Sequence, residues 1–359
     1  MILADRRGRR KNFTDRIHEP TMKKICSLFL PFLSLLLLVH CGCAGEHTVK
    51  IGGAAQGTTY HITYIARQGA DYKKNIDSIL LAVDNSLSTY VPHSIISQIN
   101  RNDSNVVTDD LFVTVFQKGQ EIAEKTGGLF DITVAPVINA WGFGATKKAQ
   151  VDSAKIDSLL QRVGYRRVRL EGRRLVKAKP QIQLDFNALA QGYTVDLLAA
   201  FLESKGIDRY LVELGGEVKA KGQKINGAYW EVGIDQPNET YTDGRPLKAV
   251  VRLQNKALAT SGNYRRFYVE SGRKYAHIID PRTGYPAKHN LLSATVIAGD
   301  CMTADAYATA FMVMGLEKAK EFLAQHKDLG LEVFLIYDAG GKWGTYTSET
   351  LKEWIKELP

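Results

Sequence analysis

Short apolar runs separated by turn residues constrain the fold of this 359-residue chain more than any other feature. The runs have the length and side-chain pattern of β-strands, and they occupy residues 58–65, 210–213, 247–253, 275–279, 292–297 and 331–337. Many of them are separated by turn signals of the kind found in antiparallel sheets, namely Gly222, Asp243-Gly244, Ser271-Gly272 and Gly340-Gly341.

Helical periodicity is also present, but it does not alternate regularly with the strand-like runs. Apolar residues recur at helical spacing over residues 76–87, 111–122 and 156–163. A doubly wound parallel sheet would require helices and strands in alternation. We therefore expect an α/β fold of the α+β type, in which mixed, largely antiparallel sheets are flanked by helices.

The positive charge of the chain is concentrated at its N-terminus. The formal net charge is +9, from 47 Lys and Arg against 38 Asp and Glu. Residues 1–40 contain eight Lys and Arg and three Asp and Glu, so they carry +5 and the remaining 319 residues carry only +4. This distribution gives no support to a nucleic-acid-binding function.

The N-terminal segment has the layout of a secretory signal. Lys23 and Lys24 precede an uncharged apolar run at residues 25–39, which is too short to span a bilayer comfortably. Two cysteines follow, so the segment resembles a bacterial lipoprotein signal in which Cys41 or Cys43 is acylated. The alternative is that the apolar run forms a buried helix.

This layout predicts three regions. Residues 1–21 are an untranslated or dispensable extension, with translation starting at Met22, and residues 22–43 are a lipoprotein signal peptide. Residues 44–359 form one domain, exported and held by a lipid anchor on the periplasmic side of the inner membrane. The cysteines left in this domain are too few for a disulfide framework, and the lack of CxxC and HExxH motifs argues against zinc.

The first of four unusual stretches spans residues 127–144. A glycine pair ends a helix, and then Trp141 and Phe143 alternate with Gly142 and Gly144. Glycine lets a backbone approach a flat ligand closely, and an aromatic ring can pack against such a ligand. The alternative is a surface loop whose two rings simply pack inward.

The second stretch, residues 183–193, runs into a helix for which Asn187 is the expected N-cap. A helix start offers free N–H groups to a phosphate, and the preceding loop can aim carbonyl oxygens at a cation. Asp185 and Gln191 lie off the apolar stripe expected to face the core, which residues 189, 193, 197 and 201 form. As isolated residues these two would be ordinary cap and surface groups.

The third stretch comprises residues 259–266 and 275–286. Ser261 beside Gly262 makes a loop suited to phosphate, and a rigid turn follows Asp280. His277 lies at the end of an expected strand, where a general base could be held in place. A purely structural histidine is the alternative.

The fourth stretch, residues 303–311, lies near the start of a helix expected to end at Gly315. Asp305 and Thr309 are four residues apart and therefore share one helix face. Both offer hard oxygen atoms, which suit Mg²⁺ better than zinc or copper. The alternative is an aspartate that only interacts with the helix dipole.

Together these stretches resemble the ApbE family of FAD:protein FMN transferases. The resemblance extends from about residue 57 to about residue 315. Its parts are LSTY to SIIS (87–97), FDIT (130–133), QGY (191–193), ELGG (213–216), TSG (260–262) and HIIDP (277–281) with Gly284. No single motif is decisive, but the ordered set is highly specific.

The resemblance implies an ApbE-like fold with FAD bound in a central cleft. Such enzymes cleave the pyrophosphate of FAD, attach FMN through a phosphoester to a Thr or Ser hydroxyl of a target protein, and release AMP. FAD contacts are implied at Thr58, Ser88, Tyr90, Ala140, Trp141, Gly142, Asp185, Gln191 and Ile279. Relatives often have an acidic residue where this chain has Gln191. The glutamine would keep a hydrogen bond to FAD but would not supply a negative charge.

The resemblance also implies Mg²⁺ at the pyrophosphate. Its ligands would be the Ala188 carbonyl, Asp305, Thr309 and the main chain at Ala308, a position where some relatives have Asp. The implied targets are membrane redox subunits with a Ser/Thr-Gly-Ala-Ser/Thr motif, such as those of the sodium-pumping NADH:quinone reductase.

The expected chemistry makes Asp305 and His277 the catalytic residues. Phosphoryl transfer depends on positioning and on neutralising charge at the phosphate oxygens, which a cation held by Asp305 would provide. His277 or Asp280 could take the proton of the acceptor hydroxyl, and His277 is favoured because an ordinary imidazole is largely neutral at pH 7. Two other functions stay open: a lipoprotein that hydrolyses FAD to FMN and AMP or stores flavin, and a non-enzymatic surface binding protein.

Overall fold

The computed structural model describes residues 45–67, 69–144, 151–237, 246–263, 267–270 and 273–358. The expected extension and signal peptide, with Cys41 and Cys43, lie outside the described residues, as do the turns at 243–244 and 271–272 and the loop at 264–266. Within these described ranges, no helix has the length and apolar character needed to cross a membrane.

A large antiparallel sheet organises the fold. Its eight strands have the order β1-β2-β5-β6-β9-β12-β13-β14, and every neighbouring pair is antiparallel. The strands are β1 (Glu46–Ala55), β2 (Thr58–Arg67), β5 (Tyr210–Leu214), β6 (Glu217–Lys221), β9 (Lys256–Gly262), β12 (Leu291–Ala298), β13 (Glu332–Asp338) and β14 (Trp343–Thr347). The prediction of largely antiparallel sheets is confirmed.

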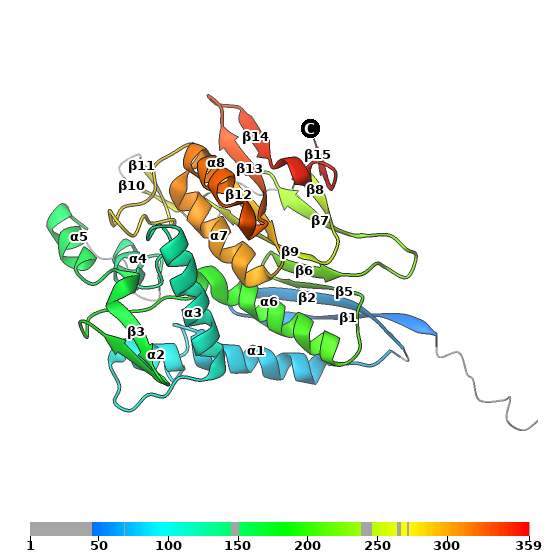
Figure 1. Ribbon diagram of the computed structural model, residues 1–359, viewed down its shortest axis with the longest axis horizontal. Coiled ribbons are helices and arrows are strands. Elements are labelled where there is room, and N and C mark those ends of the chain that lie inside the picture. The colour runs from blue at the N-terminus through cyan, green and yellow to red at the C-terminus, as the bar shows by residue number, and fades with distance from the viewer. Residues whose placement is uncertain are drawn as a thin grey trace, which may run out of the picture. The chain divides into compact units, whose positions relative to one another are not determined.

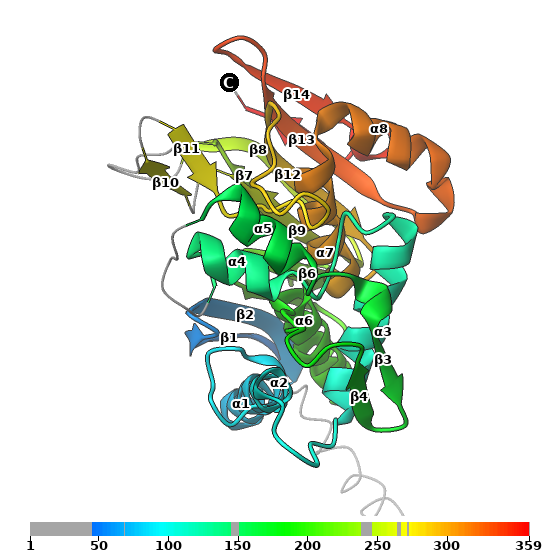
Figure 2. The same cartoon turned by 90° about the vertical axis from the view of Figure 1, so that its left-hand side faces the viewer.

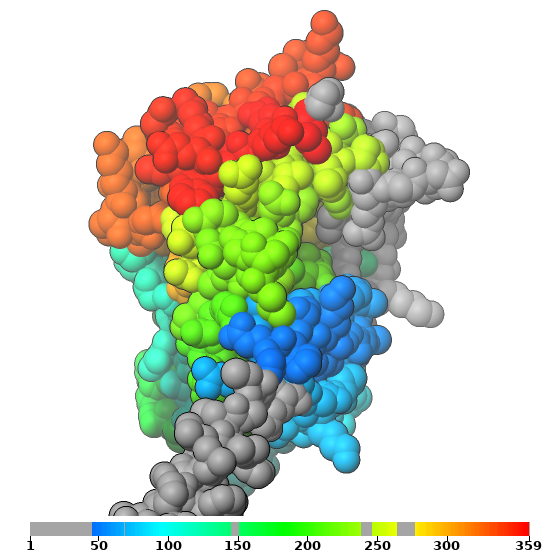
Figure 3. All heavy atoms as spheres, turned by 90° about the vertical axis from the view of Figure 1, so that its right-hand side faces the viewer, coloured from blue at the N-terminus to red at the C-terminus, as the bar shows by residue number. Residues whose placement is uncertain are grey.

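A smaller sheet covers one face of the large sheet. It has the order β15-β8-β7, with β15 (Ile355–Glu357), β8 (Leu247–Leu253) and β7 (Trp230–Asp235). Trp230 and Val251 pack with Leu258 and Phe334 in one apolar cluster between the two sheets. Figure 3 shows the C-terminal segment (red) beside these strands (yellow-green) and apart from the N-terminal hairpin (blue). Two separate hairpins join β3 (Val168–Glu171) to β4 (Arg174–Lys177) and β10 (Phe267–Glu270) to β11 (Arg273–Ala276).

Helices cover the opposite face of the large sheet (Figure 1). Helices α4 and α5 lie at one end of this layer, at the left of Figure 1 and in the foreground of Figure 2. The helices are α1 (Lys73–Leu87), α2 (Ile95–Arg101), α3 (Asp110–Lys125), α4 (Ala135–Trp141), α5 (Ser153–Leu160), α6 (Asn187–Ser204), α7 (Cys301–Met314) and α8 (Leu316–Gln325), with 3₁₀ turns η1 (Tyr165–Arg167), η2 (Lys327–Leu329) and η3 (Glu349–Leu351).

Three local predictions are wrong. The strand expected at 275–279 ends at Ala276, and beyond it only Ile279 forms an isolated bridge. Asn187 is the first residue of α6, whose N-cap is Phe186, and the Asn187 N–H donates to the Asp185 carboxylate at 2.7 Å. The stripe at 189, 193, 197 and 201 is not the core face of α6, since only Leu189 among these residues is fully buried.

Helices α6 and α7 cross at a very short distance because of Gly192. A Cβ atom at this position would lie 2.4 Å from the Cys301 carbonyl oxygen and 2.9 Å from Asp305 Cβ. Real Cβ atoms do not approach backbone oxygen atoms so closely, so only glycine fits here. This contact sets Asp305 directly against the first half of α6.

Two carboxylates hold the start of α7. Asp300 is the N-cap and accepts the Thr303 N–H at 2.8 Å. Asp196, which projects from α6, accepts the N–H groups of Cys301 and Met302. The first N–H groups of α7, which have no acceptor within the helix, are therefore hydrogen-bonded. Helix α6 is joined to α7 by these hydrogen bonds as well as by packing.

A histidine holds the end of α7. His289 donates from Nε2 to the Met312 carbonyl at 2.6 Å, and its Nδ1 accepts the Leu291 N–H at 3.1 Å. These two contacts require the neutral ring protonated on Nε2. Burial lowers the pKa of His289, although the hydrogen bond to Met312 partly opposes this shift.

Replacing Gly192 with Ala should destabilise the protein by about 1–3 kcal/mol, because the added methyl group overlaps a backbone carbonyl that cannot change rotamer. Urea unfolding of the purified variant measures the loss. Gly299→Ala is the matched control, since a Cβ there meets nothing within 4 Å, and it should stay within about 0.5 kcal/mol of the parent. Equal stability of the two variants would contradict the close crossing.

Acidification should remove the stabilisation that His289 provides. The folded pKa of His289 is below the unfolded one, so its contribution is present above the unfolded pKa and is lost as the pH falls through the folded pKa. His289→Gln should lower the free energy of unfolding by about 1–2 kcal/mol at pH 7.5. The difference in the free energy of unfolding between parent and variant should become smaller as the pH is lowered to 5. A larger difference at pH 5 would contradict this role.

Candidate functional site

The candidate site is built around Asp305 on α7. Its side chain is 6% exposed, and its Oδ2 accepts the Gly192 N–H at 3.2 Å. Burial raises the pKa of Asp305 to about 7, while the Gly192 hydrogen bond opposes the shift. A carboxylate this poorly solvated is a strong ligand for a cation, because a nearby positive charge would restore its ordinary ionisation.

Further oxygen donors lie close to Asp305. Thr309 is one turn further along α7, and its Oγ1 lies 3.2 Å from Ser261 Oγ on β9. In a regular α-helix the Gly192 amide also faces the Ala188 carbonyl, four residues earlier. The Ala188 carbonyl is therefore directed toward the same region as the Asp305 carboxylate.

These donors suit Mg²⁺ rather than a softer metal. A carboxylate, a hydroxyl and a main-chain carbonyl are hard ligands, and Mg²⁺ commonly keeps water or substrate oxygen in its other positions. Within the described part of the chain, no group of three or more His, Cys, Asp or Glu is placed to hold a metal. Ala308 is fully buried and its methyl group is no ligand, so only its main-chain oxygen could contribute.

Thr58 and Gln191 converge from different elements beside the turn between β5 and β6. A Cβ on Gly215, in that turn, would lie 2.9 Å from Thr58 Cγ2 and 3.3 Å from Gln191 Nε2. Gln56, in the turn before β2, donates to Thr194 on α6 at 2.9 Å. Its Oε1 is buried and has no hydrogen-bond partner among the described residues.

Asp185 belongs to the same end of α6. Its carboxylate accepts the Asn187 N–H, and its own N–H donates to the Ile132 carbonyl at 2.8 Å. This second bond attaches the residue to the segment that leads into α4. Burial raises the pKa of Asp185, and the hydrogen bonds from Asn187 oppose the shift.

Trp141 packs inward, as the alternative interpretation of this stretch allowed. Its side chain is buried, and its Nε1 donates to the Gly284 carbonyl at 2.8 Å. Ala140 is also buried, and Gly142 ends α4 with a φ of 80°. The Trp141 hydrogen bond fixes the turn after Asp280 against α4.

His277 and Ile279 approach this turn from β11. The His277 ring lies 6.3 Å from the Phe143 ring, and the buried Ile279 forms a bridge with Pro286. Asp280 forms an ion pair with Arg282 at 2.8 Å. Burial favours the protonated carboxyl, but hydrogen bonds from the Arg282 side chain and amide prevail and lower the pKa of Asp280.

Ser88 and Tyr90 lie in the turn between α1 and α2. The Ser88 carbonyl accepts the Ser94 hydroxyl at 2.6 Å, and Ser88 Oγ accepts the Tyr90 N–H at 3.3 Å. The Tyr90 side chain is 58% exposed. The contacts that fix these two residues are within their own turn, whereas the other predicted residues are linked through α4, α6 and α7.

Sequence reasoning missed Asp196, which links α6 to the start of α7. The residue also forms an ion pair with Lys219 of β6 at 2.7 Å. Burial raises the pKa of Asp196, and the Lys219 charge opposes the shift. In the sequence it is one polar residue within an apolar helix, and no spacing rule relates it to residue 301.

Comparison with known proteins identifies the family of this chain. The ApbE family matches residues 56–335. The FAD:protein FMN transferase of Haemophilus influenzae is 34% identical over 92% of this chain and 98% of its own, and that of Vibrio cholerae is 34% identical over 90% and 97%.

Solved structures of flavin transferases are also similar to this chain. The flavin transferase ApbE from Vibrio cholerae is 32% identical, with a TM-score of 0.76 over 86% of this chain and 100% of its own. The apo flavinyl transferase ApbE of Pseudomonas stutzeri is 31% identical, with a TM-score of 0.77 over 86% of this chain and 97% of its own. The chain therefore belongs to the ApbE family.

Proposed function

We propose that this protein is an FAD:protein FMN transferase that depends on Mg²⁺. The observation that carries the proposal is the buried Asp305 carboxylate at the crossing of α6 and α7, hydrogen-bonded to the Gly192 amide and one helical turn from Thr309. Relatives that align with nearly the whole chain bear this activity in their names.

In the proposed reaction, one bond of the FAD pyrophosphate is exchanged for a phosphoester. The oxygen of a Thr or Ser side chain attacks the phosphorus of the FMN half, the bond to the AMP oxygen breaks, and AMP leaves. Mg²⁺, when bound, would neutralise negative charge on the pyrophosphate oxygens. Asp305, Thr309 and the main-chain oxygens at Ala188 and Ala308 would hold the cation.

The FAD molecule would be positioned by residues around the start of α6. Gln191 and Thr58 offer hydrogen-bonding groups at the β5–β6 turn, and Asp185 offers a carboxyl group. Ala140, Trp141, Gly142 and Ile279 would contribute apolar surface and main-chain contacts, and Ser88 and Tyr90 would approach from the α1–α2 turn. Location of FAD in a central cleft stays a prediction.

His277 would remove the proton from the acceptor hydroxyl. Asp280 is the less suitable base, because Arg282 already holds it as a carboxylate with a lowered pKa. His277 adjoins Phe143 and the turn that Trp141 fixes, so its main chain is well anchored.

The acceptor would be a membrane redox subunit carrying a Ser/Thr-Gly-Ala-Ser/Thr motif. Export, and a lipid anchor at Cys41 or Cys43, would place the transferase at the periplasmic surface of the inner membrane, where such a motif is accessible. Lipidation is tested by the mass of the mature protein from membranes, and an unmodified N-terminus at both cysteines would contradict it.

Asp305→Asn should abolish the metal-dependent step while the fold is retained. The purified protein is incubated with FAD, Mg²⁺ and an acceptor peptide carrying the motif, and acceptor mass and AMP are followed. We expect the variant to transfer FMN about 100-fold or more slowly than the parent. Transfer by the parent should stop when Mg²⁺ is chelated. The variant should unfold at the same or a higher temperature, because it removes a poorly solvated charge.

The exposed residue Asp157 on α5 gives the matched control for that experiment, as Asp157→Asn. The control should transfer FMN at the parental rate. Full activity of Asp305→Asn would contradict the proposed ligand. AMP formed by the parent without modified acceptor would instead identify an FAD pyrophosphatase.

His277→Asn should slow transfer by about 100-fold at pH 7 while the affinity for FAD changes little, because the residue would act on the acceptor proton. Single-turnover transfer and fluorescence titration with FAD separate the two effects. An unchanged transfer rate, or a loss of FAD affinity equal to the loss of rate, would remove His277 as the base.

A further inference from the structure

Helices α6 and α7 are joined by two hydrogen bonds that run in opposite directions. The Gly192 N–H of α6 donates to Asp305 Oδ2 at 3.2 Å, and the Cys301 N–H of α7 donates to the Asp196 carboxylate at 2.9 Å. Gly192 and Asp196 are about one turn apart on α6, as are Cys301 and Asp305 on α7. The contact that reaches Asp305 and the contact that Asp196 makes therefore belong to one matched pair.

Cys301 is held from several directions at once. Its side chain is fully buried, and its Sγ lies 3.6 Å from the Val218 carbonyl oxygen and 3.9 Å from that of Leu258. Its own carbonyl oxygen is so close to Gly192 that a Cβ there would approach it to 2.4 Å. Residue 301 is therefore a fixed point of α7 between the large sheet and α6, and Asp196 binds its amide.

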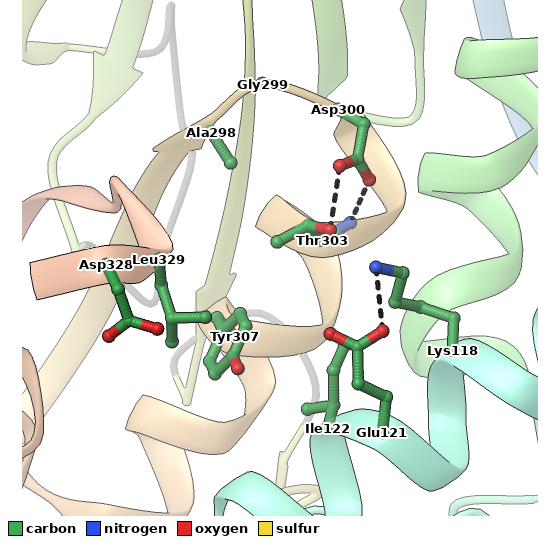
Figure 4. Close-up of a pocket in the computed structure, with 10 residues that line it drawn as sticks. All are labelled: Lys118, Glu121, Ile122, Ala298, Gly299, Asp300, Thr303, Tyr307, Asp328 and Leu329. Atoms are coloured by element: carbon green, nitrogen blue, oxygen red, sulfur yellow. Dashed lines mark hydrogen bonds and ion pairs between the residues drawn. The ribbon is translucent and has the colours of Figure 1, made fainter. Parts of the chain in front are cut away.

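A second carboxylate at the same helix start has a different role. Figure 4 shows Asp300 beside Thr303, whose N–H and hydroxyl donate to it at 2.8 and 2.9 Å. This cap stabilises the first turn of α7 from the residue that precedes the helix. Asp196 instead belongs to α6, 105 residues away from Cys301 in the chain, so it determines where α7 lies on α6.

The Asp196 carboxylate is largely removed from water. Its side chain is 15% exposed, and it pairs at 2.7 Å with Lys219 of β6, which is 21% exposed. Burial of an ion pair costs desolvation energy, so such a pair is weak evidence for added stability, and its best attested use is to fix the register of packed elements. This placement indicates that Asp196 serves the register of α7.

The register matters because Mg²⁺ tolerates little displacement of its ligands. A slip of α7 by one residue would move the Asp305 carboxylate by about 1.5 Å along the helix axis and by about 100° around it. Mg²⁺ requires nearly ideal octahedral geometry, with oxygen atoms at about 2.1 Å. Even a fraction of this slip would therefore take the carboxylate out of coordination distance.

We propose that Asp196 is a positioning residue for Asp305. By holding the Cys301 and Met302 amides, it fixes α7 in the one register that presents the Asp305 carboxylate to a cation. Asp196 itself does not contact the cation. This inference rests on the proposed role of Asp305 as a metal ligand.

The test is a titration of the purified protein with Mn²⁺ alone, in which the electron paramagnetic resonance signal of the free ion gives the affinity without turnover. Asp196→Ala removes the acceptor of both amides and should weaken Mn²⁺ binding about tenfold, as is usual for residues that orient a metal ligand. Asp196→Asn should restore the affinity to within about threefold of the parent. Its amide oxygen can accept both N–H groups, which Asp196 Oδ2 accepts at 2.9 Å.

Asp109→Ala is the matched control for the loss of a capping carboxylate. Asp109 is the N-cap of α3 and accepts the Phe112 N–H at 2.8 Å. This control should lower the urea midpoint of unfolding about as much as Asp196→Ala does, but it should bind Mn²⁺ like the parent. An equal loss of Mn²⁺ affinity in both alanine variants would overturn the proposal, because it would reflect general destabilisation.

Two further outcomes separate this proposal from the proposed function. Parental Mn²⁺ affinity in Asp196→Ala, together with lost affinity in Asp305→Asn, would overturn the positioning role and leave the metal site standing. Equal affinity in Asp305→Asn and the parent would contradict the metal site itself, and the positioning role with it. Weak binding in Asp196→Asn, equal to that of Asp196→Ala, would also count against a role through the two amides.

Discussion

The close crossing of α6 and α7 is the contact on which the site depends. Gly192 lets the backbones approach, its amide binds the Asp305 carboxylate, and Asp196 caps the next helix from the same side. Without this crossing, Asp305 would be an ordinary solvated aspartate near a helix start. With it, the carboxylate is buried, its pKa is raised, and its partner is the Gly192 amide of α6.

Much of the fold could be predicted from local patterns. The antiparallel class followed from short apolar runs and glycine turns, and the run at 247–253 corresponds to β8 residue for residue. Pairing order could not be predicted, because β9 lies between β6 and β12, which are distant in sequence. The core face of α6 was also mistaken, because apolar residues lie on most sides of this helix: Val195, Leu198 and Leu202 are fully buried, whereas the predicted stripe is mostly only partly buried.

The site was only partly predictable for the same reason. Asp305 and Thr309 were predicted to share a helix face, but that spacing alone did not separate a pair of hard oxygen ligands from an aspartate that only interacts with the helix dipole. Trp141 carried an ambiguous signal, and its hydrogen bond to the Gly284 carbonyl identifies inward packing that no sequence rule separates from ligand contact. Asp196 gave no signal, because its significance arises from Cys301, which is far away in the chain.

The most direct test of the account is a crystal structure with FAD and Mn²⁺ in place of Mg²⁺, in which anomalous scattering locates the metal. A single strong peak is expected within coordination distance of an Asp305 carboxylate oxygen and the Thr309 hydroxyl, with the FAD pyrophosphate on its open side. A peak bound elsewhere, with Asp305 still bonded only to the Gly192 amide, would contradict it.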